Sequence, residues 1–231
     1  MLFRSAFPEG LFVGAGVSMA EIHESPEVVR KYPILAEAAG KVGSAQIRNM
    51  ATIGGNACNA APSADTVLPL IAYQAQVLIG SKFGERKTNF RDFFVGPGKS
   101  ILERGSILKG FLIPTPLPKT RGFFVKHSRR VGMDLATVGV AMILELDSRE
   151  RQVEGIRVVL GAVGPTPILV KGLDSVIGEK LESAELVQVV AEQSVREATP
   201  ITDVRGSREY REEMIRRSVR ICFEGISKMV S

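Results

Sequence analysis

Residues 137–163 read TVGVAMILELDSRERQVEGIRVVLGAV and contain two apolar runs that are rich in β-branched residues. Each run, Thr137–Leu146 and Val153–Val163, is predicted to form a strand, because such side chains suit a buried pleated surface. The polar residues Asp147–Glu150 between the runs are typical of a turn. Two strands joined by a turn pair antiparallel, and this hairpin indicates the architecture of the second half of the chain.

The segments around this hairpin complete the predicted layer. Arg121–Arg130 contains a further strand, and Ile168–Val170 is predicted to be a short edge strand. Two helices follow, at about Ser183–Ala198 and Ser207–Met229. The second has an apolar stripe made of Tyr210, Met214, Val219, Phe223 and Ile226. Strands followed by helices predict an α+β layer, in which an antiparallel sheet carries helices on one face.

A proline-rich segment, Pro114–Thr120, separates this layer from the first half of the chain. Three prolines in seven residues exclude a central strand or a helix there, so we expect one domain at residues 1–116 and another at residues 121–231. The expected elements of the first domain include a capping box at Ser18–Glu21. The others are a strand at Leu11–Ala15, helices at Glu27–Val42 and Thr66–Tyr73, a hairpin of Gln76–Ile79 with Arg86–Thr88, and a strand at Ile107–Ile113.

Residues 43–65 are rich in small side chains and show neither helical nor strand periodicity. Within them, Thr52–Asn56 reads TIGGN, and its adjacent glycines permit a close approach of the backbone, with amide groups directed at an anion. Asp65 could accept hydrogen bonds from the hydroxyls of a ribose or ribityl chain, and Lys126 offers a cation. The alternative that Gly54-Gly55 is only a tight turn stays open at this point.

Several strings in the chain, taken in order, resemble one family, the FAD-binding subunits of xanthine dehydrogenases, carbon monoxide dehydrogenases and aldehyde oxidases. The resemblance runs from about residue 10 to the end of the chain. The strings are Gln46–Asn49, Ala51–Asn56, Pro62–Asp65 with Leu68-Pro69, Phe93–Gly98, Ile107–Pro114, Lys126–Arg130 with Asp134–Ala136, Gly161–Pro167, and Asp203–Ser207 with Tyr210-Arg211.

This resemblance implies a fold, a cofactor and a set of contacts. The fold would be the remainder of a PCMH-type FAD-binding domain followed by the antiparallel sheet with its helices. FAD would receive electrons from [2Fe–2S] clusters on a small subunit, fed by molybdopterin on a large subunit, and pass them to NAD or another acceptor. No catalytic acid or base and no metal ligand is assigned. The implied FAD contacts are Thr52, Ile53, Gly54, Gly55, Asn56, Asp65, Leu108 and Lys126.

One departure from the family pattern concerns the N-terminal part. Relatives begin with a small subdomain whose glycine-rich loop grips the FAD diphosphate, and nothing in Met1–Val42 matches that loop. We therefore expect the first subdomain to be missing and about half of the FAD site to be present. The alternative function is a flavin-free structural or assembly subunit that has lost the diphosphate loop.

Composition narrows the remaining function classes. The chain has 231 residues, 45% of them hydrophobic, and a formal net charge of +5, with basic and acidic residues interspersed. We expect no nucleic-acid binding, and even the basic stretch Arg205–Arg220 contains interleaved glutamates. Cys58 and Cys222 are expected to be unpaired, buried thiols in the cytoplasm, without a metal cluster. His23 and His127 are expected to be structural, and no membrane span or signal peptide is predicted.

Overall fold

A computed structural model describes residues 4–7, 10–130 and 133–230. Its first sheet is antiparallel, with the strand order β1-β2-β7-β3-β4. The strands are β1 (Arg4–Phe7), β2 (Gly10–Gly14), β7 (Ile107–Pro114), β3 (Gln76–Ser81) and β4 (Gly84–Asn89). The two strands and the hairpin expected in this half of the chain are therefore present.

Six short helices lie between β2 and β3 in the chain: α1 (Met19–Glu24), α2 (Pro26–Lys31), α3 (Pro33–Gly40), α4 (Ala45–Met50), α5 (Ile53–Cys58) and α6 (Val67–Ala72). The capping box that begins α1 is formed as predicted. The single helix expected at Glu27–Val42 is wrong, because Pro33 begins a separate helix after Tyr32, which has a non-helical backbone. The small-residue stretch also contains two helices, α4 and α5, which its lack of periodicity concealed.

An aromatic element follows the first hairpin, at the string FFVGPG. The 3-10 helix η1 (Phe90–Phe93) leads into a two-stranded ribbon of β5 (Phe94–Gly96) and β6 (Lys99–Ser100). The rings of Phe90 and Phe111 meet edge to face with their centroids 5.1 Å apart, which anchors this element on β7.

The second sheet is antiparallel and has the order β11-β10-β9-β8. Its strands are β8 (Thr120–His127), β9 (Val138–Leu146), β10 (Val153–Gly161) and the edge strand β11 (Ile168–Leu169). A short 3-10 helix, η2 (Asp174–Val176), precedes the two long helices α7 (Ala184–Glu197) and α8 (Arg208–Val230). The predicted α+β class, with an antiparallel sheet packed with helices, is confirmed.

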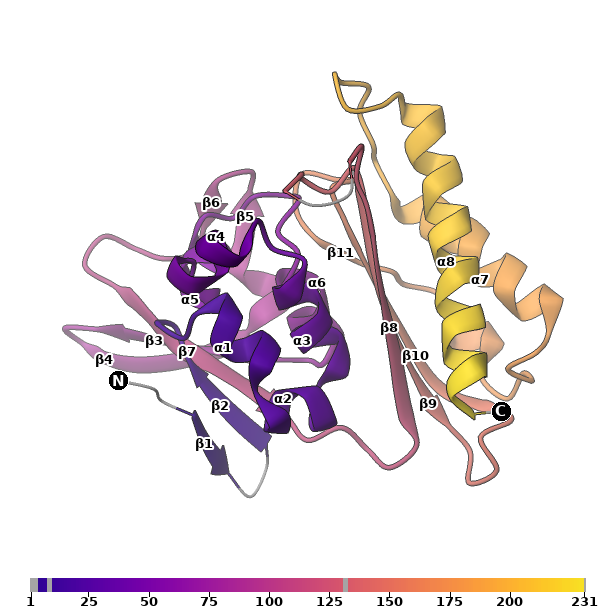
Figure 1. The fold of residues 1–231 in the computed structure, drawn as a ribbon, viewed down its shortest axis with the longest axis horizontal. Coiled ribbons are helices and arrows are strands. Elements are labelled where there is room, and N and C mark those ends of the chain that lie inside the picture. Colours follow the sequence, from indigo (N-terminus) through magenta and orange to yellow (C-terminus); the bar gives the residue numbers. More distant parts are fainter. Residues whose placement is uncertain (1–3, 8–9, 131–132, 231) are drawn as a thin grey trace.

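Both faces of the second sheet are covered, whereas the sequence predicted helices on one face only. Strands β8 to β10 stand between the helices of the first half and the pair α7 and α8 (Figure 1). Ile143 and Val159 belong to the core shared with the first sheet, while Met142 and Val158 pack with α7 and α8. This two-sided burial explains why β9 is apolar almost throughout.

Leu68 of α6 joins the two halves of the chain. Gly139 of β9 and Gly161 of β10 are directly paired, and a Cβ atom on either would lie within 3 Å of the Leu68 side chain. The paired glycines thus leave a gap in the sheet surface that Leu68, only 2% exposed, fills. The backbone N–H of Ala162 also donates to the Pro62 carbonyl oxygen at 2.7 Å, so the segment next to α6 is hydrogen-bonded to the second sheet.

A buried arginine of α8 forms hydrogen bonds at the start of β9 and at the end of β10. Arg211 of α8 is 2% exposed and donates to the carbonyl oxygens of Thr137 and Ala162 at 2.9 and 2.7 Å. It also donates to the Asp203 carboxylate at 2.7 Å. Its neighbour Tyr210 is 47% exposed, so the predicted apolar stripe of α8 wrongly included that tyrosine.

Candidate functional site

The TIGGN turn begins helix α5 and is held against the end of β2. The backbone N–H of Ile53 donates to the Val17 carbonyl oxygen at 3.0 Å, and that of Gly54 donates to the Ala15 carbonyl oxygen at 2.9 Å. Thr52 is the N-cap residue of the helix. The amide of Gly54, expected from the sequence to face an anion, and the amide of Ile53, which the resemblance assigns to FAD, are therefore both hydrogen-bonded within the chain.

The next two amides are engaged by the cap itself. Gly55 N–H donates to Thr52 Oγ1 at 3.0 Å, and Asn56 N–H donates to the Thr52 carbonyl oxygen at 2.9 Å. The Asn56 side chain accepts a hydrogen bond of 2.8 Å from the buried Thr66 hydroxyl, which ties α5 to the start of α6. The Thr52 hydroxyl accepts from Gly55 and keeps its own hydrogen available for a ligand.

The two glycines of this turn have different surroundings. A Cβ at Gly54 would lie 2.5 Å from Ala15 Cβ and 2.7 Å from the Ala15 carbonyl oxygen, so Gly54 is required for the contact of α5 with β2. Gly55 is exposed, and a Cβ there would meet only Thr52 Oγ1, at 3.0 Å. Gly54 thus serves internal packing, whereas Gly55 is the position at which a ligand has room to approach this turn.

Asp65 and Lys126, separated by 61 positions in the sequence, meet in one ion pair. Lys126 Nζ lies 2.7 Å from Asp65 Oδ2, and the side chains are 8% and 9% exposed. Lys126 also donates to the Lys41 carbonyl oxygen at 2.9 Å. Among the described residues, only Lys126 hydrogen-bonds the Asp65 carboxylate, so Oδ1 remains free to accept a hydrogen bond from a hydroxyl.

Burial dominates the electrostatics of this pair. Loss of hydration raises the pKa of Asp65 from 3.8 to about 6, although the Lys126 charge opposes the rise. The carboxylate is therefore ionised at neutral pH but titrates within two pH units below it. A ligand hydroxyl that donates to the ionised oxygen would lower the pKa of Asp65 again.

Leu108, the remaining predicted contact, lies in a row of side chains across the first sheet. Leu108 of β7 is paired with Ile79 of β3, and Ile79 is paired with Arg86 of β4. Directly paired residues point to the same face of a sheet. Leu108 is 9% exposed, so it belongs mainly to the core, whereas Arg86 at the edge of the sheet is exposed.

The histidines and cysteines lie outside this arrangement. Burial, and then the Arg217 charge, lowers the pKa of His127. Cys222 is buried, but Cys58 is exposed, so the expectation of two buried thiols is wrong for Cys58. In the ranges that the structure describes, no group of three potential metal ligands occurs.

Comparison with known proteins identifies the family. The family model for the FAD binding domain in molybdopterin dehydrogenase matches residues 4–116. The family model for the CO dehydrogenase flavoprotein C-terminal domain matches residues 123–226. The xanthine dehydrogenase FAD-binding subunit of Escherichia coli O157:H7 is 32% identical over 207 residues, which are 89% of this chain and 70% of that protein. The chain belongs to the FAD-binding subunits of the molybdenum hydroxylase family.

Further relatives agree with this assignment. The carbon monoxide dehydrogenase medium chain of Hydrogenophaga pseudoflava is 30% identical over 202 residues, 87% of this chain and 69% of that protein. The structure of carbon monoxide dehydrogenase from the same organism, which lacks the Mo-pyranopterin moiety, matches with a TM-score of 0.92 and 26% identity. That match covers 98% of this chain and 78% of the other. The family predicted from the ordered strings is confirmed.

One further observation concerns the membrane. No helix within the described ranges is both long and apolar enough to cross a bilayer.

Proposed function

We propose that this chain binds FAD and passes electrons from the [2Fe–2S] clusters of a small subunit, through the flavin, to NAD or another acceptor. Substrate hydroxylation would take place at the molybdopterin of a large subunit. Residues 1–116 would form the FAD-binding domain, and residues 121–231 would form the C-terminal domain. We also place the chain in the cytoplasm, where its free thiols Cys58 and Cys222 would stay reduced.

The observation that carries this proposal is the chemistry of the buried Asp65–Lys126 pair. A carboxylate with one free oxygen accepts hydrogen bonds from the hydroxyls of a ribityl or ribose chain. Lys126, already within 2.7 Å of that carboxylate, adds positive charge beside an anionic cofactor. The Thr52 hydroxyl and the open side of Gly55 supply a donor and room for a phosphate. These groups fit FAD.

Each residue would bind or orient FAD, and none would make or break a covalent bond. Asp65 and Thr52 would orient the hydroxyls and the diphosphate, and Lys126 would hold Asp65 in its ionised form. When bound, FAD supplies the capacity to accept and release electrons, which no side chain of the chain provides. We assign no proton transfer to any residue.

A specific observation favours the second candidate, a flavin-free assembly subunit. The amides of Ile53, Gly54, Gly55 and Asn56 are all hydrogen-bonded within the chain, so they offer a diphosphate no unpaired donor. Under this alternative the Asp65–Lys126 pair serves only to join the two halves of the molecule.

Titration of the full chain with FAD, followed by flavin absorbance, separates the two candidates. Thr52→Val removes the hydroxyl at nearly constant shape, and Thr52→Ser retains it as the matched control. We expect the dissociation constant for FAD to rise about 5- to 150-fold in Thr52→Val and little in Thr52→Ser, from loss of a hydrogen bond of about 1–3 kcal/mol. Absence of FAD from the wild-type chain, alone and assembled with its partner subunits, would establish the assembly role instead.

A further inference from the structure

Lys41, the C-cap residue of helix α3, contacts strand β8 through both its side chain and its backbone. Its Nζ lies 3.4 Å from the Phe124 carbonyl oxygen, to which it donates, and 5.1 Å from the centre of the Phe124 ring. In the opposite direction, Lys126 Nζ donates to the Lys41 carbonyl oxygen at 2.9 Å. The end of α3 and the end of β8 are therefore joined by two hydrogen bonds from lysines that run in opposite directions.

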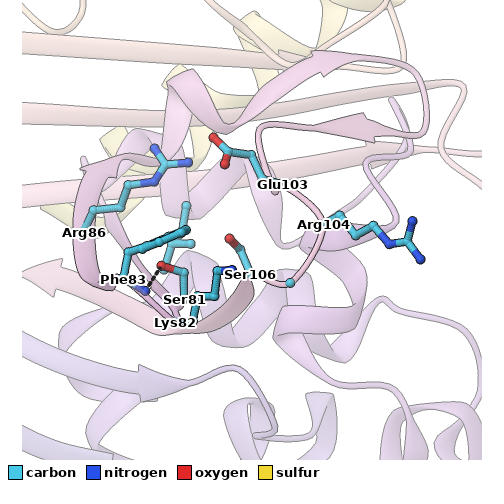
Figure 2. Close-up of a pocket in the computed structure, with 9 residues that line it drawn as sticks. Ser81, Lys82, Phe83, Arg86, Glu103, Arg104 and Ser106 are labelled. Carbon is cyan, nitrogen blue, oxygen red and sulfur yellow. Dashed lines mark hydrogen bonds between the residues drawn. The ribbon is translucent and has the colours of Figure 1, made fainter.

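The ring that Lys41 contacts is buried and has a fixed position. Phe124 is 1% exposed and belongs to the core shared with the first sheet, on the same face of β8 as Lys126. A second lysine–ring contact differs from this one, because Lys82 Nζ lies 4.8 Å from the Phe83 ring within a single hairpin turn. Phe83 is 89% exposed there and lines a cavity of about 420 Å³ (Figure 2). The Lys41 contact, by comparison, connects two distant parts of the chain and adds a cation–π attraction between them.

The loop between α3 and α4 presents the Lys41 carbonyl in a defined direction. Arg48 of α4 donates to the next two carbonyl oxygens, those of Val42 and Gly43, at 3.2 and 3.4 Å. Gly43 has a φ of +50°, which favours glycine, and a Cβ there would lie 2.7 Å from the Ile47 side chain. The last carbonyls of a helix lack partners within it and carry the negative end of its dipole, so cationic groups are favoured at this position.

Lys41 also acts on Asp65 through its charge. Burial raises the pKa of Asp65 to about 6, and the charges of Lys126 and, after it, Lys41 oppose that rise. The two charges reach the carboxylate from different elements, β8 and the end of α3. An ionised carboxylate accepts a stronger hydrogen bond from a hydroxyl than a protonated one does. Lys41 therefore favours the state of Asp65 that is the better acceptor.

We propose that Lys41 is a positioning residue of the candidate FAD site, which holds Lys126 against Asp65 and keeps the carboxylate ready to accept a hydroxyl of the cofactor. The inference rests on the proposed FAD binding and adds to it a residue that the family resemblance does not assign. Lys41 acts through Lys126 and Asp65 rather than by contact with FAD. Because α3 lies in residues 1–116 and β8 in residues 121–231, this contact also makes FAD affinity depend on how the two proposed domains are joined.

The test titrates the full chain with FAD between pH 5 and 8 and follows flavin absorbance. Lys41→Met removes the charge, and Lys41→Arg retains it. Lys31→Met is the matched control, because Lys31 forms an ion pair of the same i,i+4 spacing with Glu27 on α2, at 3.2 Å, as Lys41 does on α3. We expect the dissociation constant for FAD at pH 7 to rise about 2- to 5-fold in Lys41→Met and to change little in the other two variants. The pH below which FAD affinity falls should move upward by about 0.2–0.7 pH unit in Lys41→Met alone.

Several outcomes would overturn the inference. Weaker FAD binding in Lys41→Met without a shift of its pH profile would mean that Lys41 only supports the fold. Unchanged FAD binding in Lys41→Met, or equal losses in Lys41→Met and Lys41→Arg or in Lys41→Met and Lys31→Met, would also overturn it.

Failure of the proposed function gives a different result, since the wild-type chain would then bind no FAD. Titration of the Asp65 carboxyl carbon by NMR in the FAD-free chain decides the role of Lys41 in that case. A midpoint that is higher in Lys41→Met than in the wild type and in Lys31→Met supports the positioning role, and an unchanged midpoint overturns it.

Discussion

Replacing Lys126 by methionine tests the buried ion pair. The expected loss in the free energy of unfolding depends on pH, because the pKa of Asp65 is raised in the fold. Methionine keeps much of the side-chain length and removes the charge that lies 2.7 Å from Asp65. Forcing a buried carboxylate to remain ionised without its partner costs about 3–5 kcal/mol. The variant avoids much of this cost at neutral pH because Asp65 can bind a proton instead.

The direction in which the free energy of unfolding changes with pH follows from the raised pKa of Asp65, which is about 6 in the fold and 3.8 without burial. A raised carboxyl pKa stabilises the fold below pH 3.8, and that contribution is lost as the pH rises through about 6. In Lys126→Met the pKa of Asp65 rises further. The two proteins should therefore have similar free energies of unfolding at pH 5 and differ by about 1.4 kcal/mol more for each pH unit above 6.

Urea denaturation followed by circular dichroism measures this difference at pH 5, 7 and 8. At pH 7 the expected loss is about 1.4 kcal/mol, and at pH 8 it is about 2.7 kcal/mol. In an Asp65→Asn background, which has no carboxyl group to titrate, the effect of Lys126→Met should be independent of pH. A loss of equal size at pH 5 and pH 8 in the otherwise wild-type chain would refute the reasoning.

Two further predictions concern packing and use the same denaturation assay. Leu68→Ala should lower the free energy of unfolding by about 2–5 kcal/mol, and Gly161→Ala by about 1–3 kcal/mol, since the new methyl group meets Leu68. The double variant should lose less than the sum, and strict additivity would contradict the contact. Gly54→Ala should cost about 1–3 kcal/mol because its Cβ meets Ala15, whereas Gly55→Ala should change stability by less than about 1 kcal/mol. Equal effects at the two glycines would contradict their different roles.

The strands were predictable from sequence because local pattern determines them. Thr137–Leu146 and Val153–Val163 are long β-branched runs, and β9 and β10 lie within them. The short helices α4 and α5 were not predictable in the same way. Each is six residues long, so no apolar period can develop, and the starts of the two helices are determined by the N-cap residues Ser44 and Thr52.

The roles of the glycines also needed the structure. The TIGGN string indicated a close backbone approach, which is correct for Gly54, where the structure shows that the neighbouring group within the chain is Ala15. Similarly, Gly139 and Gly161 lie within the predicted strands, and only the fold places Leu68 over both. A glycine indicates that another group comes close to the backbone, and the identity of that group depends on long-range contacts.

Some features of the protein and its candidate site follow from the sequence, and others only from the tertiary structure. The sequence alone determined the family and the α+β class, because these depend on residue types in a fixed order, and it also led us to propose a set of side chains for FAD. Only the tertiary structure decided that Asp65 and Lys126 form one buried ion pair, that the TIGGN amides are engaged within the chain, and that a cavity lies beside Phe83. Each of these depends on atoms brought together from distant positions, and burial changes the energy of a charge in ways that local sequence does not encode.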